Sequence, residues 1–315
     1  MSLGELAGAI DCGTNSTRLL IAGPSGEQVE RLLTITRLGQ GVDQTGILSQ
    51  EAIQRTIEAL RSYKQVLNRH EVNLRRLIAT SAVRDAGNFQ EFLDGAQDAT
   101  GITPEIIDGQ EEGRLSFLGA TAALNTTGSK ILVLDIGGGS TEFVAGVAKR
   151  RPDFVRSLNM GCVRITEKFL HDDPPSISQL RDAQAFVEEL VHGLVIEVSS
   201  LYSSDLFEGH SLFGLAGTVT AISAIAQGLL SYDPHKTHHS KLSLAAIRRI
   251  KDEMVTMTAK ARSRRYALEI GRADVIVAGL LILDRVVEIL KFDEVTVSEA
   301  DILDGIVADL FSGDR

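Results

Sequence analysis

The sequence has no tryptophan, only two cysteines (Cys12 and Cys162) and only six prolines among 315 residues. Two cysteines exclude a disulfide-stabilised scaffold and fit a reducing compartment. The longest apolar runs, such as residues 275–283, are far too short to span a bilayer. No basic segment leading into an apolar stretch opens the chain, so we expect no secretion signal. We therefore expect a cytoplasmic protein with no membrane partner.

The chain also lacks long charge runs and low-complexity segments, and its net charge is −10. This charge argues against a protein that coats nucleic acid, so we expect no nucleic-acid partner. An anionic substrate remains open, because a cleft can be locally basic on an acidic protein. Hydrophobic residues make up 43% and charged residues 23%, as in ordinary soluble proteins. The length suffices for two domains with substantial cores.

Short apolar runs that end in glycine-rich turns alternate with longer segments of helical periodicity. This alternation predicts an α/β fold. Ser49 is a suitable N-cap for the first long helix. We expect strands at 6–11, 17–23, 76–81, 131–137, 142–147 and 211–217, and helices at 51–70, 177–202, 244–261, 273–290 and 300–312.

The sequence contains two similar loop segments, IDCGTNSTR (residues 10–18) and LDIGGGSTE (residues 134–142). Aligning Asp11 with Asp135 also matches the glycine, serine and threonine that follow. Glycine lets the backbone approach an anion and turn its N–H groups toward it. An aspartate and a phosphate repel each other, so Asp135 is expected to act on phosphate through a bound Mg²⁺ ion rather than by direct contact. The alternative is a tight hairpin turn in which Asp135 is a local cap.

The composition changes at residues 123–130, just before the second loop. We place a domain boundary there, between a first domain at 1–125 and a second at 126–297. Because each half opens with a similar strand–loop–strand unit, we expect a duplicated fold with a cleft between the copies.

These loops resemble those of the actin-like phosphotransferase superfamily and, more narrowly, of the exopolyphosphatase and guanosine pentaphosphate phosphohydrolase family. The narrower resemblance rests on further segments that occur in the right order. These are TSAVRDAGN (80–88), IIDGQEEGRLSFLGA (106–120), NMGCVRITEKFL (159–170), GLAGTVTAI (214–222), YDPHKTHHSKL (232–242), GRADVIVAGLLIL (271–283) and VSEADILDGIV (297–307).

The resemblance implies two actin-like (ribonuclease H-like) domains, each a mixed sheet flanked by helices, with the active site in the interdomain cleft. It also implies that the final helix, at about 298–315, returns to the first domain. The sequence stops at Arg315, without the further helical region of many relatives. It therefore looks like the short form of the family, for which we expect short substrates. The family forms homodimers, so we expect one here.

By resemblance, Glu112 is the general base that activates the attacking water, in preference to Glu111. The alternative is that both are ordinary acidic residues in the first turn of a helix. Arg84 resembles the arginine that binds phosphate and stabilises the transferred group. The alternative for Arg84 is a surface pair with Asp85. Glu142 is expected to position the water or hold metal, the alternative being an exposed strand residue.

The remaining implied site residues bind phosphate or a metal ion, Mg²⁺ or alternatively Mn²⁺. Asp11 is expected near the metal without direct contact. Asn88 is a weaker donor candidate, and Arg18 either faces the cleft or forms a strand-end salt bridge. The basic residues 260–265 with Arg272 either guide a polyanion or form a solvated helix end. The phosphate-binding candidates are Gly13, Thr14, Asn15, Ser16, Gly137, Gly138, Gly139, Ser140, Gly217 and Thr218, and the metal candidates are Asp135, Glu142 and Asp11.

The resemblance implies a phosphoric anhydride hydrolase, an exopolyphosphatase that releases terminal orthophosphate from inorganic polyphosphate. Guanosine pentaphosphate is the alternative substrate, because the loops read phosphates rather than a base. Two further hypotheses are an ATP-dependent kinase of the same superfamily and a non-catalytic sensor of polyphosphate or alarmone. The QEEGR segment argues against the kinase, and the intact acidic and arginine candidates argue against the sensor.

Overall fold

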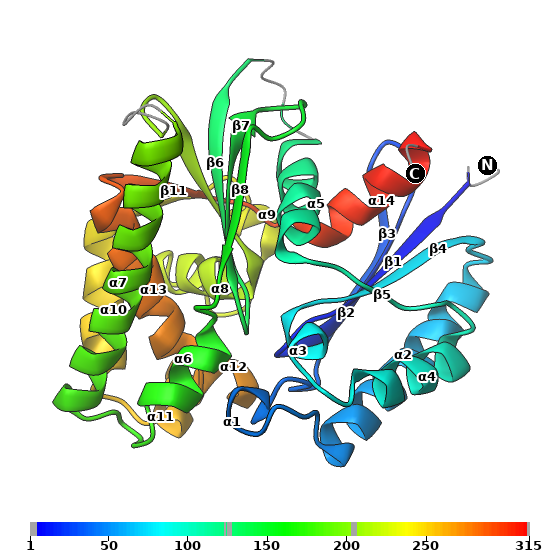
Figure 1. Cartoon of the computed structure of the whole chain (residues 1–315), viewed down its shortest axis with the longest axis horizontal. Helices are drawn as coiled ribbons and strands as arrows, with labels where there is room; N and C mark the ends of the chain where they lie inside the picture. Colours follow the sequence, from blue (N-terminus) through cyan, green and yellow to red (C-terminus); the bar gives the residue numbers. More distant parts are fainter. Residues whose placement is uncertain (1–4, 123, 125–127, 203–206, 314–315) are drawn as a thin grey trace. The chain divides into compact units, whose positions relative to one another are not determined.

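The computed structural model describes residues 5–122, 124, 128–202 and 207–313. The chain divides into two compact units (Figure 1). Unit 1 comprises Met1–Asn125 and Ala300–Arg315, and unit 2 comprises Thr126–Glu299. Of the predicted boundary at 123–130, residues 123 and 125–127 lie outside the described residues. Within the described ranges, no helix combines the length and apolarity needed to cross a membrane.

Unit 1 is built on a mixed sheet with strand order β3-β2-β1-β4-β5. The first three strands form an antiparallel meander, and β4 and β5 add in parallel after helical crossovers. Its elements are β1 (Ala7–Cys12), β2 (Ser16–Ala22), β3 (Gln28–Ile35), α1 (Val42–Thr45), α2 (Gln50–Arg69), β4 (Leu74–Ala79), α3 (Ser81–Arg84), α4 (Phe89–Thr100), β5 (Glu105–Ile106), α5 (Gly109–Ala122) and α14 (Ile302–Ser312).

Strand β1, in the middle of this sheet, is buried on both of its faces, which explains why it is apolar at nearly every position. Ile10 and Cys12 contribute to a core that includes residues of α2 and α4. Ala7 and Ala9 contribute to a second core, which includes residues of α5 and α14. Alternation along the strand puts Asp11 on this second face, beneath α5 and α14.

Helix α14 follows all of unit 2 in the chain yet belongs to unit 1, where it packs along α5. The two helices touch backbone to backbone through glycine. A Cβ atom on Gly119 would lie 1.9 Å from the carbonyl oxygen of Asp301, and one on Gly305 would lie 1.9 Å from that of Leu115. Any side chain at either glycine would push these helices apart.

Unit 2 contains a larger mixed sheet with strand order β10-β11-β9-β6-β7-β8. Strands β6, β7 and β8 form an antiparallel meander, and β9 and β11 add in parallel. Its elements are β6 (Lys130–Ile136), β7 (Thr141–Val147), β8 (Phe154–Leu158), α6 (Cys162–Phe169), α7 (Ile177–Leu201), β9 (Ser211–Leu215), α8 (Ala216–Ala226), α9 (Pro234–Thr237), β10 (Lys241–Ser243), α10 (Leu244–Met254), α11 (Ala259–Tyr266), α12 (Ile270–Ala273), α13 (Ile276–Ile289) and β11 (Glu294–Val297).

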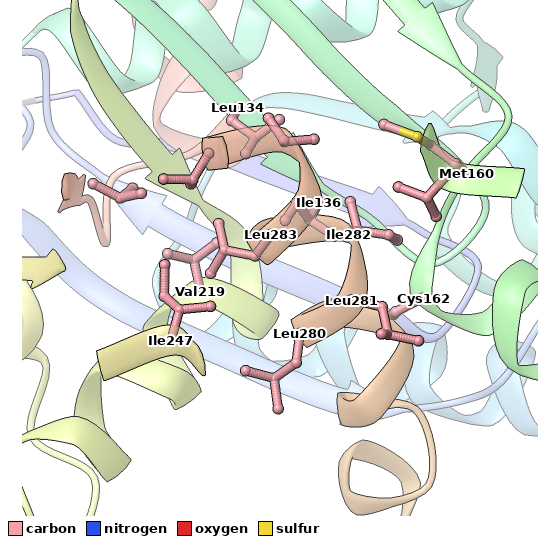
Figure 2. Close-up of a cluster of buried hydrophobic side chains, with 14 of the residues drawn as sticks. Leu134, Ile136, Met160, Cys162, Val219, Ile247, Leu280, Leu281, Ile282 and Leu283 are labelled. Atoms are coloured by element: carbon pink, nitrogen blue, oxygen red, sulfur yellow. The ribbon is translucent and has the colours of Figure 1, made fainter. Parts of the chain in front are cut away.

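The core of unit 2 centres on α13, whose side chains are apolar almost all round. Figure 2 shows Leu280, Leu281, Ile282 and Leu283 of this helix projecting in several directions among side chains from the sheet and from other helices. A helix buried on all sides explains the unbroken apolar run at 275–283 without any membrane.

The two units share one connectivity. In each, a three-strand antiparallel meander is followed by strands that join beside its first strand in parallel. The sequence reveals the duplication only in the loops, whereas the structure shows it in the whole sheet. The predicted strands and the helices at 51–70 and 177–202 are confirmed with small shifts at their ends.

The predicted helix at 244–261 is wrong in extent, because the chain forms two helices, α10 and α11, separated at 255–258. Thr258 caps the second helix through its side chain, and the Ala259 N–H donates to the Asp173 carboxylate. These side-chain acceptors satisfy the first N–H groups of α11, so the second helix starts afresh.

Candidate functional site

The first loop of the doubled pair joins β1 to β2 and is closed by a hydrogen bond from Gly13 N to Ser16 O, 3.0 Å. The carbonyls of Thr14 and Asn15 accept from Gly39 N and Arg37 N, both at 2.9 Å. In a trans peptide the C=O and the following N–H point in opposite directions. The amides of Asn15 and Ser16 therefore point away from the 37–39 segment, as a phosphate-binding loop requires.

The second loop, between β6 and β7, repeats this arrangement, with Gly137 N bonded to Ser140 O at 3.0 Å. Here the first N–H groups of α6 donate to the loop carbonyls. Cys162 N donates to Gly137 O and Val163 N to Gly138 O, both at 2.9 Å. The amides of Gly138 and Gly139 are consequently turned away from α6.

Gly161, directly before α6, allows the loop and the start of the helix to lie this close together. A Cβ atom there would lie 2.2 Å from the Gly138 carbonyl carbon and oxygen and 2.4 Å from Gly139 N. Arg164, in the first turn of α6, adds a bond from Nε to Gly139 O at 2.8 Å. The conformation of this loop is therefore fixed by hydrogen bonds within the chain.

The two loops differ in charge at one equivalent position. In unit 1 the register pairs Asp11 with Arg18, whereas in unit 2 it pairs Asp135 with Glu142. Residues directly opposite in an antiparallel pair lie on the same face, a few ångströms apart. Unit 1 thus presents a neutralised pair and unit 2 two carboxylates side by side. Glu142 is only 1% exposed, so its reading as an exposed strand residue is wrong.

The Asp11 carboxylate is held by Arg18, whose Nη2 lies 2.6 Å and Nε 3.1 Å from Oδ2. Arg18 also bonds Asp301, the N-cap of α14, so its reading as a strand-end salt bridge is confirmed. Burial raises the pKa of Asp11, and Arg18 opposes that rise. The other oxygen, Oδ1, is buried without a hydrogen-bond partner among the described residues.

The carboxylate pair of unit 2, Asp135 and Glu142, fits a hydrated magnesium ion. Two buried acidic side chains on one face repel each other unless a cation lies near them. Among the described residues, no group of three or more His, Cys, Asp or Glu is placed to hold a metal. A site with one or two protein carboxylates and several waters is the usual Mg²⁺ arrangement. The metal role expected for Asp11 stays a prediction.

Glu112 and Arg84 lie together in unit 1. Glu112 is at the start of α5 and Arg84 at the end of α3, with Nη1 of Arg84 3.4 Å from Oε2 of Glu112. The same nitrogen donates to Ile107 O at 2.8 Å. The α3 helix is tied to the first loop through Thr14 Oγ1 and Ser81 Oγ, 2.9 Å apart. A carboxylate, a guanidinium and a phosphate-type loop therefore meet in one unit.

Glu111, in contrast, is committed to a structural network. Arg114 binds it through two bonds, Nε to Oε2 at 2.7 Å and Nη2 to Oε1 at 2.8 Å. These bonds hold the pKa of Glu111 below its ordinary value. Arg114 also binds Asp309 of α14, and Arg76 of β4 binds the same carboxylate. This division of roles supports the choice of Glu112 as the base.

Asn88, the weaker donor candidate, makes a structural contact, and its phosphate-binding role stays a prediction. Its side chain bonds both the N–H and the carbonyl of Leu48, at 2.8 and 3.0 Å. Asn88 therefore ties the loop before α2 to the start of α4.

Gly217 and Thr218 lie at the start of α8. Arg272 donates from Nη1 to Gly217 O, and a Cβ atom on Gly217 would overlap this guanidinium. The Thr218 hydroxyl is directed at the Cys162 thiol, where it opposes the rise in pKa that burial causes. Their phosphate-binding role stays a prediction.

Sequence reasoning assigned no role to Gly161, Arg164 or Ser157, whose hydroxyl bonds Glu142. Gly161 and Arg164 lie in a segment already recognised in the family resemblance, NMGCVRITEKFL. A glycine directly before a helix was the available signal for a close backbone contact. Ser157 carried no signal, because β8 was not among the expected strands.

Comparison with known proteins places these geometries in a family. The Ppx/GppA phosphatase family matches residues 23–312 of the chain. A protein of Mycobacterium tuberculosis named Exopolyphosphatase 2 is 40% identical, over 98% of this chain and 99% of its own length.

Solved structures agree along nearly the whole chain. The crystal structure of an exopolyphosphatase-like protein has 35% identity and a TM-score of 0.88, over 96% of this chain and 98% of its own. A Ppx/GppA family member from Aquifex aeolicus has 31% identity and a TM-score of 0.79, over 99% of each chain. The two-domain α/β fold expected from the sequence is thereby confirmed.

Proposed function

Because this chain belongs to the Ppx/GppA phosphatase family and is a hydrolase of the exopolyphosphatase type, we propose that it releases terminal orthophosphate from short chains of inorganic polyphosphate. The proposed nucleophile is a water activated by Glu112, with Mg²⁺ assisting. The substrate is suggested by the printed name of the 40% identical mycobacterial relative. The observation that carries the mechanism is the pairing of Arg84 with Glu112 at 3.4 Å.

Hydrolysis of a phosphoanhydride needs an oriented water and neutralised charge more than covalent help. Glu112 is a suitable base because its side chain is largely buried, at 12% exposure, at the beginning of a helix. Arg84 supplies the planar guanidinium that matches two phosphate oxygens. Its bond to the Ile107 carbonyl orients that guanidinium without using all of its donors.

The two loops would bind phosphate groups through backbone N–H groups. These N–H groups point outward because the preceding carbonyls accept hydrogen bonds from within the chain. Ser16 and Ser140 add hydroxyl groups at equivalent positions. Asp135 and Glu142 would hold Mg²⁺, and the expected role of Asp11 near a metal ion stays a prediction. When bound, the ion offsets the negative charge of the substrate and of the transition state. The chain's own groups position the substrate and accept the water's proton.

The decisive experiment measures orthophosphate release by the wild-type protein and by Glu112→Gln, with Glu111→Gln as the matched control. We expect Glu112→Gln to lose at least about 10²-fold in kcat, as for other general bases. Glu111→Gln should keep its kcat, because Glu111 binds Arg114 rather than substrate. Removal of divalent ions with a chelator should abolish release, and added Mg²⁺ or Mn²⁺ should restore it.

The substrates are short polyphosphate, long polyphosphate and guanosine pentaphosphate, assayed side by side. The proposal expects the highest kcat/KM for short polyphosphate. A preference for guanosine pentaphosphate would replace the substrate while leaving the chemistry intact. Binding of polyphosphate without release under any metal would show a sensor instead. The predicted homodimer is checked on the same sample by light scattering.

A further inference from the structure

Three polar residues form a line across the sheet of unit 2. Asp135 of β6 pairs with Glu142 of β7, and Glu142 pairs in turn with Ser157 of β8. Because residues paired directly across antiparallel strands point to the same face, all three side chains lie on one side of the sheet. The proposed function uses the first two and gives the third no role.

Ser157 makes a specific contact with its neighbour. Its Oγ donates to Oε1 of Glu142 over 2.7 Å. Glu142 is 1% exposed and Ser157 is partly buried, so water competes little for this bond. A hydroxyl that donates to a carboxylate forms a short, strong hydrogen bond under such conditions. The bond restricts the side-chain torsions of Glu142 and fixes the direction of its carboxylate.

The other unit provides an internal comparison. At the position equivalent to Glu142, unit 1 has Arg18, and the residue paired with Arg18 on the outer strand is Leu33. Leu33 cannot hydrogen-bond through its side chain, and Arg18 is oriented instead by Asp11 and Asp301. A hydroxyl thus stands beside the acidic member of the duplicated pair and not beside the basic one.

We propose that Ser157 is a positioning residue that aims the Glu142 carboxylate at the divalent ion and its bound water. This inference rests on the proposed function. Without the hydroxyl, a buried carboxylate oxygen loses a hydrogen-bond donor and the side chain gains access to other rotamers. Groups that orient a metal-binding side chain commonly affect metal affinity and activity by 10- to 100-fold.

The test compares Ser157→Ala with Ser157→Thr, which keeps the hydroxyl on a strand position that tolerates β-branching. Ser199→Ala is the matched control, because Ser199 is exposed on α7 and its hydroxyl donates to the helix backbone at Val195. Glu142→Gln is the reference for loss of the carboxylate charge. Mn²⁺ binding to the substrate-free protein is measured by electron paramagnetic resonance, alongside kcat and KM for short polyphosphate and thermal unfolding.

We expect Ser157→Ala to weaken Mn²⁺ binding and to lower kcat, each roughly 10-fold, with a smaller change in KM. Ser157→Thr should recover most of both losses, and Ser199→Ala should match the wild type. If Ser157→Ala binds Mn²⁺ and turns over like the wild type while Glu142→Gln fails in both, the positioning role is refuted and the proposed function stands. A wild type that neither binds Mn²⁺ nor releases phosphate would refute both together.

Discussion

The glycine contact between α5 and α14 predicts opposite outcomes for two glycine-to-alanine changes. A Cβ atom on Gly305 would lie 1.9 Å from the Leu115 carbonyl oxygen, about 1.5 Å short of an ordinary 3.4 Å contact. Rotamer changes cannot relieve this overlap, because the position of a Cβ atom is set by the backbone and the Leu115 oxygen is itself a backbone atom. At Gly193, on an exposed part of α7, the same added atom has no described atom within 4 Å apart from the helix's own nearby backbone.

The magnitudes follow from these distances. Overpacking of about this size lowers the free energy of unfolding by roughly 3 kcal/mol, and the higher helix propensity of alanine raises it by about 1 kcal/mol. Gly305→Ala should therefore lower the free energy of unfolding by about 2 kcal/mol. Gly193→Ala gains the propensity alone and should raise it by about 1 kcal/mol. Because α5 carries Glu112, a shift of about 1 Å should also reduce kcat by up to about 10²-fold for Gly305→Ala only.

The assay is urea unfolding followed by circular dichroism, with kcat measured on the same preparations. A lower midpoint for Gly305→Ala together with a higher midpoint for Gly193→Ala supports the reasoning. If Gly305→Ala raises the midpoint as Gly193→Ala does, the two helices do not touch backbone to backbone and the argument fails.

Three further predictions use other parts of the chain. Ala216 has a φ of 65°, a conformation that costs a residue with a Cβ atom about 1 kcal/mol or more, so Ala216→Gly should raise the urea midpoint; a lower midpoint would contradict this strain. Because the pKa of Glu111 is lowered in the folded protein, its ionised carboxylate stabilises the fold at pH values above 4.5, its ordinary pKa. That stabilisation is lost as the pH falls through the folded-state pKa. The melting temperature of Glu111→Gln should therefore depend less on pH in this acidic range than that of the wild type, and an unchanged pH profile would argue against the Arg114 pairing. Burial raises the pKa of both thiols, so Cys12 and Cys162 should resist a thiol reagent at pH 8 in the folded protein and react after unfolding, whereas fast labelling of either would disprove its burial.

Local signals predicted the parts of the fold that depend on short-range physics. Ser49 caps α2 through its side chain, as its position before the apolar periodicity indicated. The doubled loops were readable because each places its glycines and hydroxyls within a few residues of one strand end. Strands β3 and β8 were not among those expected, because each lies at or near a sheet edge and carries polar or partly exposed residues at many positions.

The candidate site was predicted as a set of residues but not as a set of contacts. Glu111 and Glu112 begin the same helix, and the only local difference between them is Arg114, which lies three residues after Glu111. That Arg114 is also fixed by Asp309 of α14, almost 200 residues away in the chain, could not be predicted from the sequence. In the same way, the charge at position 18 or 142 has meaning only once the register pairs it with an aspartate. Ser157 required the position of β8, which sequence patterns did not supply.

The late position of α14 in the chain bears on biosynthesis. Residues 126–299 emerge from the ribosome as a unit that can bury its own core, while the apolar face of β1 and α5 must wait for the helix that covers it. The first half of the protein to be made is consequently the last to be finished. During that interval the nascent chain exposes a surface containing Ala7, Ala9 and Leu115, and exposed apolar surface of this kind favours aggregation.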